Sequence, residues 1–244
     1  MDDVKKLFTE LLAERQLQLS DKQWEQFETY FRELVSWNEK MNLTGITERE
    51  QVYMKHFYDS LSLSFFVPMS ELSTIADIGS GAGFPSIPLR IVFPHLRVTI
   101  VDSLNKRIQF LNHLVQSLGL EHVTCIHGRA EDVARMNGQR DSYDLVTARA
   151  VARLNVLAEF CLPFVRKSGL FAAMKGADPE EELREAAFSL RQLRGVVKSV
   201  ASFQLPIEQS SRHIILIEKV GATPQKYPRK AGLPLKQPLI GAPR

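Results

Sequence analysis

Apolar positions recur with a helical period in the first quarter of the chain. Between residues 24 and 35 they return every three or four residues, which is the spacing of one helical face. Ser20 stands three residues before Gln23, a capping-box pattern at the start of this helix. Thr47 stands at the same distance from an acid, ahead of a second apolar segment. We therefore expect a helical segment over residues 1–67.

From about residue 70 the pattern changes to short, β-branched apolar runs that alternate with amphipathic segments. Strands separated by helices predict a parallel sheet. The last two runs are joined by a connection too short for a crossover helix, so they should pair as an antiparallel hairpin. The predicted strands are 74–78, 98–101, 123–126, 145–148, 170–174, 196–203 and 214–217. The sequence thus predicts a doubly wound, mostly parallel seven-stranded α/β sheet with a closing antiparallel hairpin and an N-terminal helical extension.

The segment from residue 221 onward differs from the rest of the chain in composition and charge. It holds five prolines, so we expect it to be extended. It also holds five basic residues and no acid, whereas the whole chain carries a net charge of only +3. A basic tail on a slightly acidic body suggests an anionic partner, although a solvated tail that aids solubility explains it equally well. We divide the chain into a helical segment 1–67, a core domain 68–220 and a basic tail 221–244.

Composition narrows the class of protein further. The chain is 44% hydrophobic and 24% charged, which is ordinary for a folded protein. No apolar run approaches the roughly 20 residues that cross a bilayer, and the acidic start is unlike a signal peptide. Cys125 and Cys161 lie far apart without metal-ligand spacing, as expected of thiols in a reducing compartment. We expect a cytoplasmic monomer that binds no membrane and no metal.

The strongest local signal is a glycine-rich turn after the first predicted strand. Residues 75–84 are Ile-Ala-Asp-Ile-Gly-Ser-Gly-Ala-Gly-Phe, with Asp77 in the strand and glycines at alternate positions. Glycine allows a sharp turn and the close approach of a ligand, and open α/β sheets bind ligands at this end of their strands. Asp102 ends the next strand, where a carboxylate can accept hydrogen bonds from both ribose hydroxyls. A nucleoside-containing cofactor is therefore expected, and a glycine turn without a ligand is the alternative.

Two features of the turn distinguish between nucleoside cofactors. A dinucleotide fingerprint requires glycine at the position of Phe84. Asp77, beside the turn, would repel a pyrophosphate but attract the ammonium group of a methionine moiety. The sequence therefore favours S-adenosylmethionine over a nicotinamide dinucleotide.

At this point the chain resembles the Class I methyltransferases, and more closely the bacterial family that methylates guanine N7 in 16S ribosomal RNA, formerly called glucose-inhibited division protein B. The similarity covers nearly the whole chain. The Arg-Ala-Val and Tyr-Pro-Arg motifs are more specific than the glycine-rich turn. The motifs are Trp37-Asn38 with Met41-Asn42-Leu43-Thr44, His56 with Asp59-Ser60-Leu61, Asp77–Pro85, Gly128-Arg129-Ala130-Glu131, Ala148-Arg149-Ala150-Val151, Met174-Lys175-Gly176 and Tyr227-Pro228-Arg229-Lys230-Ala231-Gly232.

The resemblance implies roles for particular residues. Gly79 and Phe84 would line the methionine end of the cofactor pocket. The reasoning above adds Asp77 beside the methionine ammonium and Asp102 beside the ribose. Ala130 and Glu131 would lie against the adenine, although an acid at a helix start is common anyway. Arg149 would face the site from the end of the fourth strand. The implied partner is 16S ribosomal RNA or the small ribosomal subunit, methylated at a guanine of the decoding region.

Missing motifs limit the chemistry. The fourth strand lacks the Asn/Asp-Pro-Pro-aromatic loop of enzymes that methylate base amines. Enzymes that methylate cytosine C5 need a cysteine nucleophile, but Cys161 lies in an apolar helical run that is typical of a protein core. Guanine N7 has a free lone pair, so no proton must leave before it attacks. We therefore expect no catalytic base and a positioning role for Arg149.

The resemblance and the charge pattern also suggest residues that contact RNA. These are Lys175, Tyr227, Arg229 and Lys230, with Tyr227 as a stacking surface. His56 is a helix-packing residue or an RNA contact. Three alternatives stay open: a nicotinamide-dependent oxidoreductase, a noncatalytic ribosome-assembly factor that keeps the pocket, and a small-molecule methyltransferase.

Overall fold

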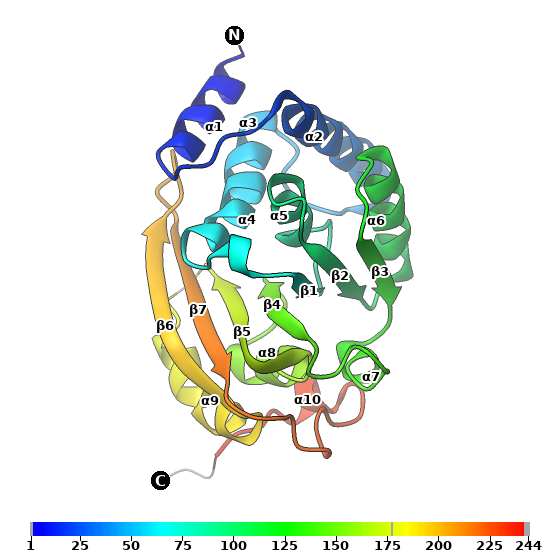
Figure 1. Ribbon diagram of the computed structural model, residues 1–244, viewed down its shortest axis with the longest axis vertical. Coiled ribbons are helices and arrows are strands. Elements are labelled where there is room, and N and C mark those ends of the chain that lie inside the picture. The colour runs from blue at the N-terminus through cyan, green and yellow to red at the C-terminus, as the bar shows by residue number, and fades with distance from the viewer. Residues whose placement is uncertain (1, 177, 242–244) are drawn as a thin grey trace.

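The computed structural model describes residues 2–176 and 178–241, and its centre is a seven-stranded sheet in the order β3-β2-β1-β4-β5-β7-β6 (Figure 1). The first five strands of that order run parallel, and β7 is antiparallel to both β5 and β6. The predicted α/β fold with its closing hairpin is therefore confirmed. The strands are β1 (Thr74–Ile78), β2 (Arg97–Asp102), β3 (Val123–His127), β4 (Tyr143–Arg149), β5 (Val165–Lys175), β6 (Gly195–Gln204) and β7 (Ser211–Lys219).

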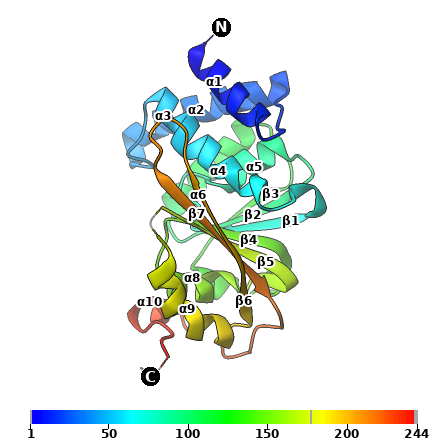
Figure 2. The same ribbon diagram turned by 90° about the vertical axis from the view of Figure 1, so that its left-hand side faces the viewer.

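Helices cover both faces of the sheet, as Figure 2 shows. Successive side chains of a strand point to opposite faces, so Ile75 joins one apolar cluster and Ala76 joins the other. One face carries α1 (Asp3–Ala13), α2 (Asp21–Met41), the helical segment 49–65, α5 (Ser86–Val92) and α6 (Asn105–Ser117). The opposite face carries α7 (Ala130–Val133), α8 (Leu154–Cys161) and α9 (Glu180–Gln192). A 3-10 turn, η3 (Met69–Glu71), leads into β1.

The N-terminal helices share one apolar core with the sheet. Phe8 and Phe27 belong to the same buried cluster as Ile100 of β2. The capping box of α2 forms as predicted, and the Gln23 amide also donates to the carbonyl of Ile91 at 2.8 Å. The start of the next helix was predicted one residue too early, at the Thr47 cap. The Glu48 carboxylate caps it instead, accepting from two backbone N–H groups.

Residues 49–65 form one continuous helical segment with a widened turn in its middle. A π-helix, η1 (Tyr53–Tyr58), lies between α3 (Arg49–Val52) and α4 (Asp59–Leu61), and a 3-10 turn, η2 (Ser62–Phe65), follows. Widened turns of this kind often occur at functional sites because they change the direction of side chains. Here the widened turn carries His56 and ends next to Asp59.

The segment after β7 is packed against the body rather than solvated. The ammonium group of buried Lys219 contacts Asp141 at 2.8 Å and the Thr223 hydroxyl at 2.7 Å. The Arg140 guanidinium donates to the Tyr227 carbonyl at 2.9 Å. The expectation of an entirely extended tail was wrong, because a short helix, α10 (Leu233–Lys236), begins after Gly232. Over the described residues, no helix has the length and apolar character to span a membrane.

Candidate functional site: two adjoining pockets at the strand ends

The carboxyl ends of the parallel strands surround a cavity of about 250 Å³, which we call the glycine-loop pocket. The fold brings four of the predicted cofactor-binding residues together here: Gly79, Asp102, Ala130 and Glu131. Apolar side chains make up much of the rest of the lining. They are Ile78, Val101, Ala150, Val151, Phe160 and Leu235. Its size and its mixture of apolar wall and carboxylates suit a nucleoside.

The conformation of the loop explains its glycines. Gly79 has a φ of +73°, and a Cβ there would lie 2.9 Å from Cγ2 of Val151. Gly83 has a φ of +100°, and a Cβ there would lie 2.8 Å from the Tyr30 hydroxyl oxygen. Positive φ is strained for other residues, and these approaches are closer than a side chain tolerates. The turn therefore keeps its shape only with glycine at both positions.

Buried polar atoms gather beneath the loop. Asp77 is fully buried, and its Oδ2 accepts from the backbone N–H of Ser86 at 3.2 Å. Within the described part of the chain, Asp77 Oδ1 and the hydroxyls of Ser80 and Ser86 have no hydrogen-bond partner. Burial raises the pKa of Asp77 to about 7. Buried polar atoms normally find partners, so this group suits a ligand with a cationic donor.

Asp102 lines the glycine-loop pocket with a carboxylate that is only loosely held. Its Oδ1 accepts from the N–H of Leu104 at 2.9 Å. Its Oδ2 has two long contacts, 3.3 Å from the N–H of Gly81 and 3.4 Å from the Arg107 guanidinium. A carboxylate oxygen accepts more than one hydrogen bond, so Asp102 can still accept from a ligand hydroxyl.

The tail closes one side of the glycine-loop pocket. Leu235 lines it, and the backbone N–H of Gly232 donates to the carboxylate of buried Glu131 at 2.8 Å. Glu131 is thus more than an ordinary acid in the first turn of α7, because it both lines the pocket and holds the tail.

The predicted RNA-binding residues of the tail lie in different environments. The Tyr227 ring is 5% exposed and packs in the apolar cluster of α8 and α9, so it offers no stacking surface. Two guanidinium nitrogens of Arg229 contact the carboxylate of Glu159, at distances from 2.7 to 3.1 Å, and Glu159 is 1% exposed. Lys230, by contrast, is exposed. A buried carboxylate needs a cation beside it, which accounts for the position of Arg229.

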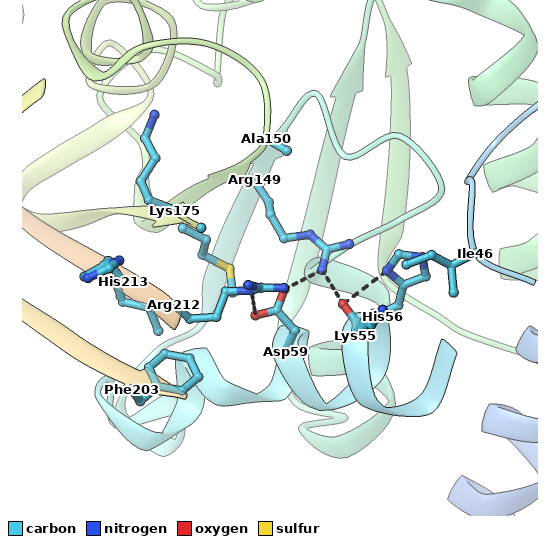
Figure 3. A pocket seen from close by; sticks show the side chains of 13 residues that line it. Ile46, Lys55, His56, Asp59, Arg149, Ala150, Lys175, Phe203, Arg212 and His213 are labelled. Carbon is cyan, nitrogen blue, oxygen red and sulfur yellow. Dashed lines mark hydrogen bonds and ion pairs between the residues drawn. The ribbon is translucent and has the colours of Figure 1, made fainter. Parts of the chain in front are cut away.

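A second cavity of about 370 Å³, the arginine pocket, adjoins the first (Figure 3). Asp59 lies between two guanidinium groups, with 2.8 Å from Oδ2 to Arg149 Nη1 and 3.3 Å from Oδ1 to Arg212 Nε. Lys175 also lines this pocket, and its ammonium group contacts Glu182 and the Ala152 carbonyl, both at 2.7 Å. Ala150 lines both pockets, so they meet at the end of β4.

Phe84 packs behind the loop rather than lining either pocket. Its ring stacks between Tyr30, at 5.4 Å, and His56, at 4.7 Å between centroids, and the Arg149 guanidinium lies over it. The Thr44 hydroxyl lies 2.8 Å from His56 Nε2. Burial, reinforced by the charge of Arg149, lowers the pKa of His56 to about 3. His56 is therefore a neutral packing residue that joins the N-terminal helices to the loop.

Several residues of the arginine pocket lay outside the sequence predictions, above all Asp59, Arg212 and His213. Asp59 stands in the motif that begins at His56 and is the only charged residue between Phe57 and Val67, but no role was predicted for it. Arg212 and His213 reach the site because β7 is antiparallel to β5, which sets His213 opposite Lys175. Within the described residues, no cluster of three or more His, Cys, Asp or Glu side chains is arranged to hold a metal ion.

The sheet order and the position of the glycine-loop pocket define the fold class of this protein, which is the Class I methyltransferase fold. Two solved structures share the fold at low sequence identity. A putative O-methyltransferase from Klebsiella pneumoniae has a TM-score of 0.54 and 13% identity, over 87% of this chain and 96% of that one. A putative sarcosine dimethylglycine methyltransferase from Galdieria sulphuraria has a TM-score of 0.52 and 12% identity, over 67% and 86%.

The chain belongs to the rRNA small subunit methyltransferase G (GidB) family, whose model matches residues 23–215. Proteins named ribosomal RNA small subunit methyltransferase G are similar to it over nearly their whole length. The Brevibacillus brevis protein is 55% identical, over 97% of this chain and 99% of its own. Those of Bacillus pumilus and Bacillus subtilis are 58% and 55% identical, each over 96% and 98%. The family resemblance drawn from the motifs is confirmed.

Proposed function

We propose that this protein transfers the methyl group of S-adenosylmethionine to N7 of a guanine in the decoding region of 16S ribosomal RNA. The observation that carries the proposal is the junction at Ala150. A nucleoside-sized pocket that contains the carboxylates of Asp102 and Glu131 meets a cationic pocket there, at the end of β4. One pocket suits a sulfonium cofactor and the other suits a nucleotide of an RNA chain.

The residues of the glycine-loop pocket fit S-adenosylmethionine. Asp102 would accept hydrogen bonds from the ribose hydroxyls, and Ala130 and Glu131 would lie against the adenine. The unpartnered Oδ1 of Asp77 would attract the methionine ammonium, beside the turn at Gly79. When bound, the cofactor supplies an electrophilic methyl group. The loop and these acids hold and orient it.

We propose that no side chain acts as an essential general base. His56 has a pKa of about 3, which makes it a poor proton acceptor. Burial raises the pKa of Cys125 to about 11 and that of Cys161 well above its usual value, so neither supplies a thiolate nucleophile. Guanine N7 attacks with a lone pair and releases no proton. Positioning by Arg149 and its neighbours is then sufficient.

RNA contacts are proposed for the cationic rim. Lys175 and Arg149 line the arginine pocket, and Lys230 is exposed on the tail. We assign Tyr227 and Arg229 to holding the tail in place. We also propose that the protein acts in the cytoplasm, because both cysteines are free thiols and the proposed substrate is ribosomal. A monomer remains our prediction.

The test is transfer of labelled methyl groups to ribosomal RNA. Purified protein is incubated with tritiated S-adenosylmethionine and with small subunits from cells that lack the gene, and N7-methylguanosine is mapped on the RNA. We expect one modified guanine, absent from the RNA of those cells and present in wild-type RNA. Binding of the cofactor without any transfer would instead support a noncatalytic assembly factor. Transfer only to small molecules would support a small-molecule methyltransferase.

A further inference from the structure

Asp59 combines deep burial with an unsatisfied oxygen. The residue is 3% exposed, and its Oδ2 accepts from Arg149. Its Oδ1 lies 3.3 Å from Arg212 Nε, but this approach lacks hydrogen-bond geometry, and no other described group bonds to that oxygen. His213 Nδ1, on the same pocket, is likewise buried and without a partner among the residues described. Buried polar atoms are normally hydrogen-bonded in folded proteins, so two unpaired atoms on one pocket indicate that a ligand completes them.

The charges of the arginine pocket indicate what kind of ligand this is. Lys55 and Lys175 each pair with a separate acid, Glu208 and Glu182. Arg149 and Arg212 share the single carboxylate of Asp59, which leaves one positive charge in excess. The pocket therefore suits a group that offers hydrogen-bond donors to Asp59 and a negative charge nearby. A nucleotide, with a donor-bearing base and a phosphate, has both.

We propose that Asp59 recognises the target base by accepting hydrogen bonds from N1–H and the N2 amine of guanine; this inference rests on the proposed function. Guanine alone among the four bases has two adjacent donors on one edge. Adenine and cytosine place a ring acceptor beside their amine, and a carboxylate repels that acceptor. Uracil has a single ring donor between two carbonyls. A buried carboxylate thus selects guanine as it selects the paired N–H groups of arginine.

The position of Asp59 also sets the orientation of the base. N7 lies on the edge of guanine that is remote from N1 and N2. Asp59 and Ala150 line the same pocket, and Ala150 also borders the glycine-loop pocket. The proposal therefore requires that a guanine held at Asp59 turns its N7 edge toward the junction of the two pockets.

The same contact strengthens during transfer. The N7 lone pair forms the new N–CH₃ bond while the S–CH₃ bond breaks, with its electron pair remaining on sulfur. The sulfur becomes neutral, the purine gains the positive charge, and no proton leaves. A cationic purine makes N1–H and the N2 amine stronger donors, so their bonds to Asp59 tighten. An interaction that tightens toward the transition state accelerates the reaction.

The experiment compares guanosine with inosine at the target nucleotide. Inosine lacks only the N2 amine, and a 16S transcript with a single inosine can be made by ligation once the target has been mapped. For the wild-type protein we expect inosine to react about 10-fold more slowly in single-turnover transfer at saturating S-adenosylmethionine. For Asp59→Asn we expect a slower rate for guanosine and a guanosine-to-inosine ratio within about twofold of one.

Controls separate recognition from a structural role. Glu208→Gln removes an exposed acid that pairs with Lys55, and should leave the ratio at its wild-type value. If Asp59→Asn is slower but keeps the wild-type ratio, Asp59 merely holds the two arginines and the proposal is overturned. Equal rates on both RNAs with the wild-type protein overturn it even where the variant does not fold. Absence of transfer to either RNA by a wild-type protein that binds S-adenosylmethionine in calorimetry would instead defeat the proposed function.

Discussion

The glycine-loop pocket and the arginine pocket share Ala150 but are built in different ways. Short contiguous motifs at strand ends form most of the first, and its shape comes from backbone turns such as the one at Gly79. Side chains from distant segments form the second: Asp59 from a helix, Arg149 from β4 and Arg212 from β7. With the ligands assigned as proposed, the difference teaches that local backbone geometry can hold a cofactor common to many enzymes, whereas a particular acceptor needs a side-chain network assembled by the whole fold.

The two pockets also differ in charge. Asp102 and Glu131 line the glycine-loop pocket together with Arg107 and Arg129, and Asp77 is buried beneath the loop. In the arginine pocket, Arg149 and Arg212 share one carboxylate, which leaves a positive excess. Under the proposed function, the carboxylates of Asp77 and Asp102 attract the cationic cofactor, and the positive excess of the arginine pocket attracts the anionic RNA. Changes to either pocket should therefore affect one ligand and spare its neighbour.

The largest expected effect comes from the tail that closes the glycine-loop pocket. Arg229→Ala leaves Glu159 buried without a cation, which should lower the free energy of unfolding by about 3–5 kcal/mol in urea denaturation. The variant should also bind S-adenosylmethionine more weakly. The exposed neighbour gives the control, because Lys230→Ala should change stability by less than about 0.5 kcal/mol. If the Arg229→Ala protein is stable and binds cofactor normally but loses affinity for RNA, the RNA contact predicted from the sequence is correct and the structural role proposed for Arg229 is wrong.

The next effect is confined to cofactor affinity. Asp102→Asn keeps the size of the side chain but removes the charged acceptor, and hydrogen bonds to charged groups contribute about 1.5–3 kcal/mol. We expect S-adenosylmethionine to bind roughly 10- to 150-fold more weakly in calorimetry. RNA affinity in filter binding should stay within about twofold. An equal loss of both affinities would show that the two pockets are not independent.

A smaller effect follows from the titration of Asp77. With a pKa of about 7, the carboxyl is mostly neutral at pH 6 and mostly charged at pH 7.5. If it holds the methionine ammonium, cofactor affinity should rise about 5- to 10-fold over that interval, and Asp77→Asn should remove the dependence. The stability of the cofactor-free protein should change with pH in the opposite direction. Because the folded-state pKa is raised, the free energy of unfolding should fall as the pH rises from about 4 through about 7.

The smallest effect concerns His56. Its pKa of about 3 keeps it neutral throughout the physiological range, so it should contribute no inflection to the single-turnover rate between pH 5 and 8. The measurement is a pH–rate profile at saturating cofactor and RNA. A steep loss of rate assigned to one titrating group, with binding intact, would contradict transfer without a general base.

The sequence predicted the sheet and the glycine-loop pocket because their signals are local. Alternation of apolar runs and helices located every strand, and the spacing of Asp77, the glycines and Asp102 followed from one strand–turn unit. The arginine pocket could not be predicted in this way. Its geometry depends on the pairing of β7 with β5 and on the widened turn at Tyr53–Tyr58, and both are set by packing across the sheet.

The charge of the tail was visible in the sequence, but its partners were not. Arg229 and Glu159 are 70 positions apart, so a count of basic residues could not distinguish a held arginine from a free one. A weak signal existed in both regions. Glu159 and Asp59 are lone acids within apolar helical runs, and an acid in such a place needs a cation from elsewhere in the chain.

The contact between Gly232 and Glu131 has a consequence for biosynthesis. Translation proceeds from the N-terminus, so every strand of the sheet is made before residues 223–235. A nascent chain that stops at β7 has the loop and the acids but lacks the wall supplied by Leu235 and the N–H group that holds Glu131. The wall at Leu235 and the hydrogen bond to Glu131 therefore form only once the last residues of the chain have been made.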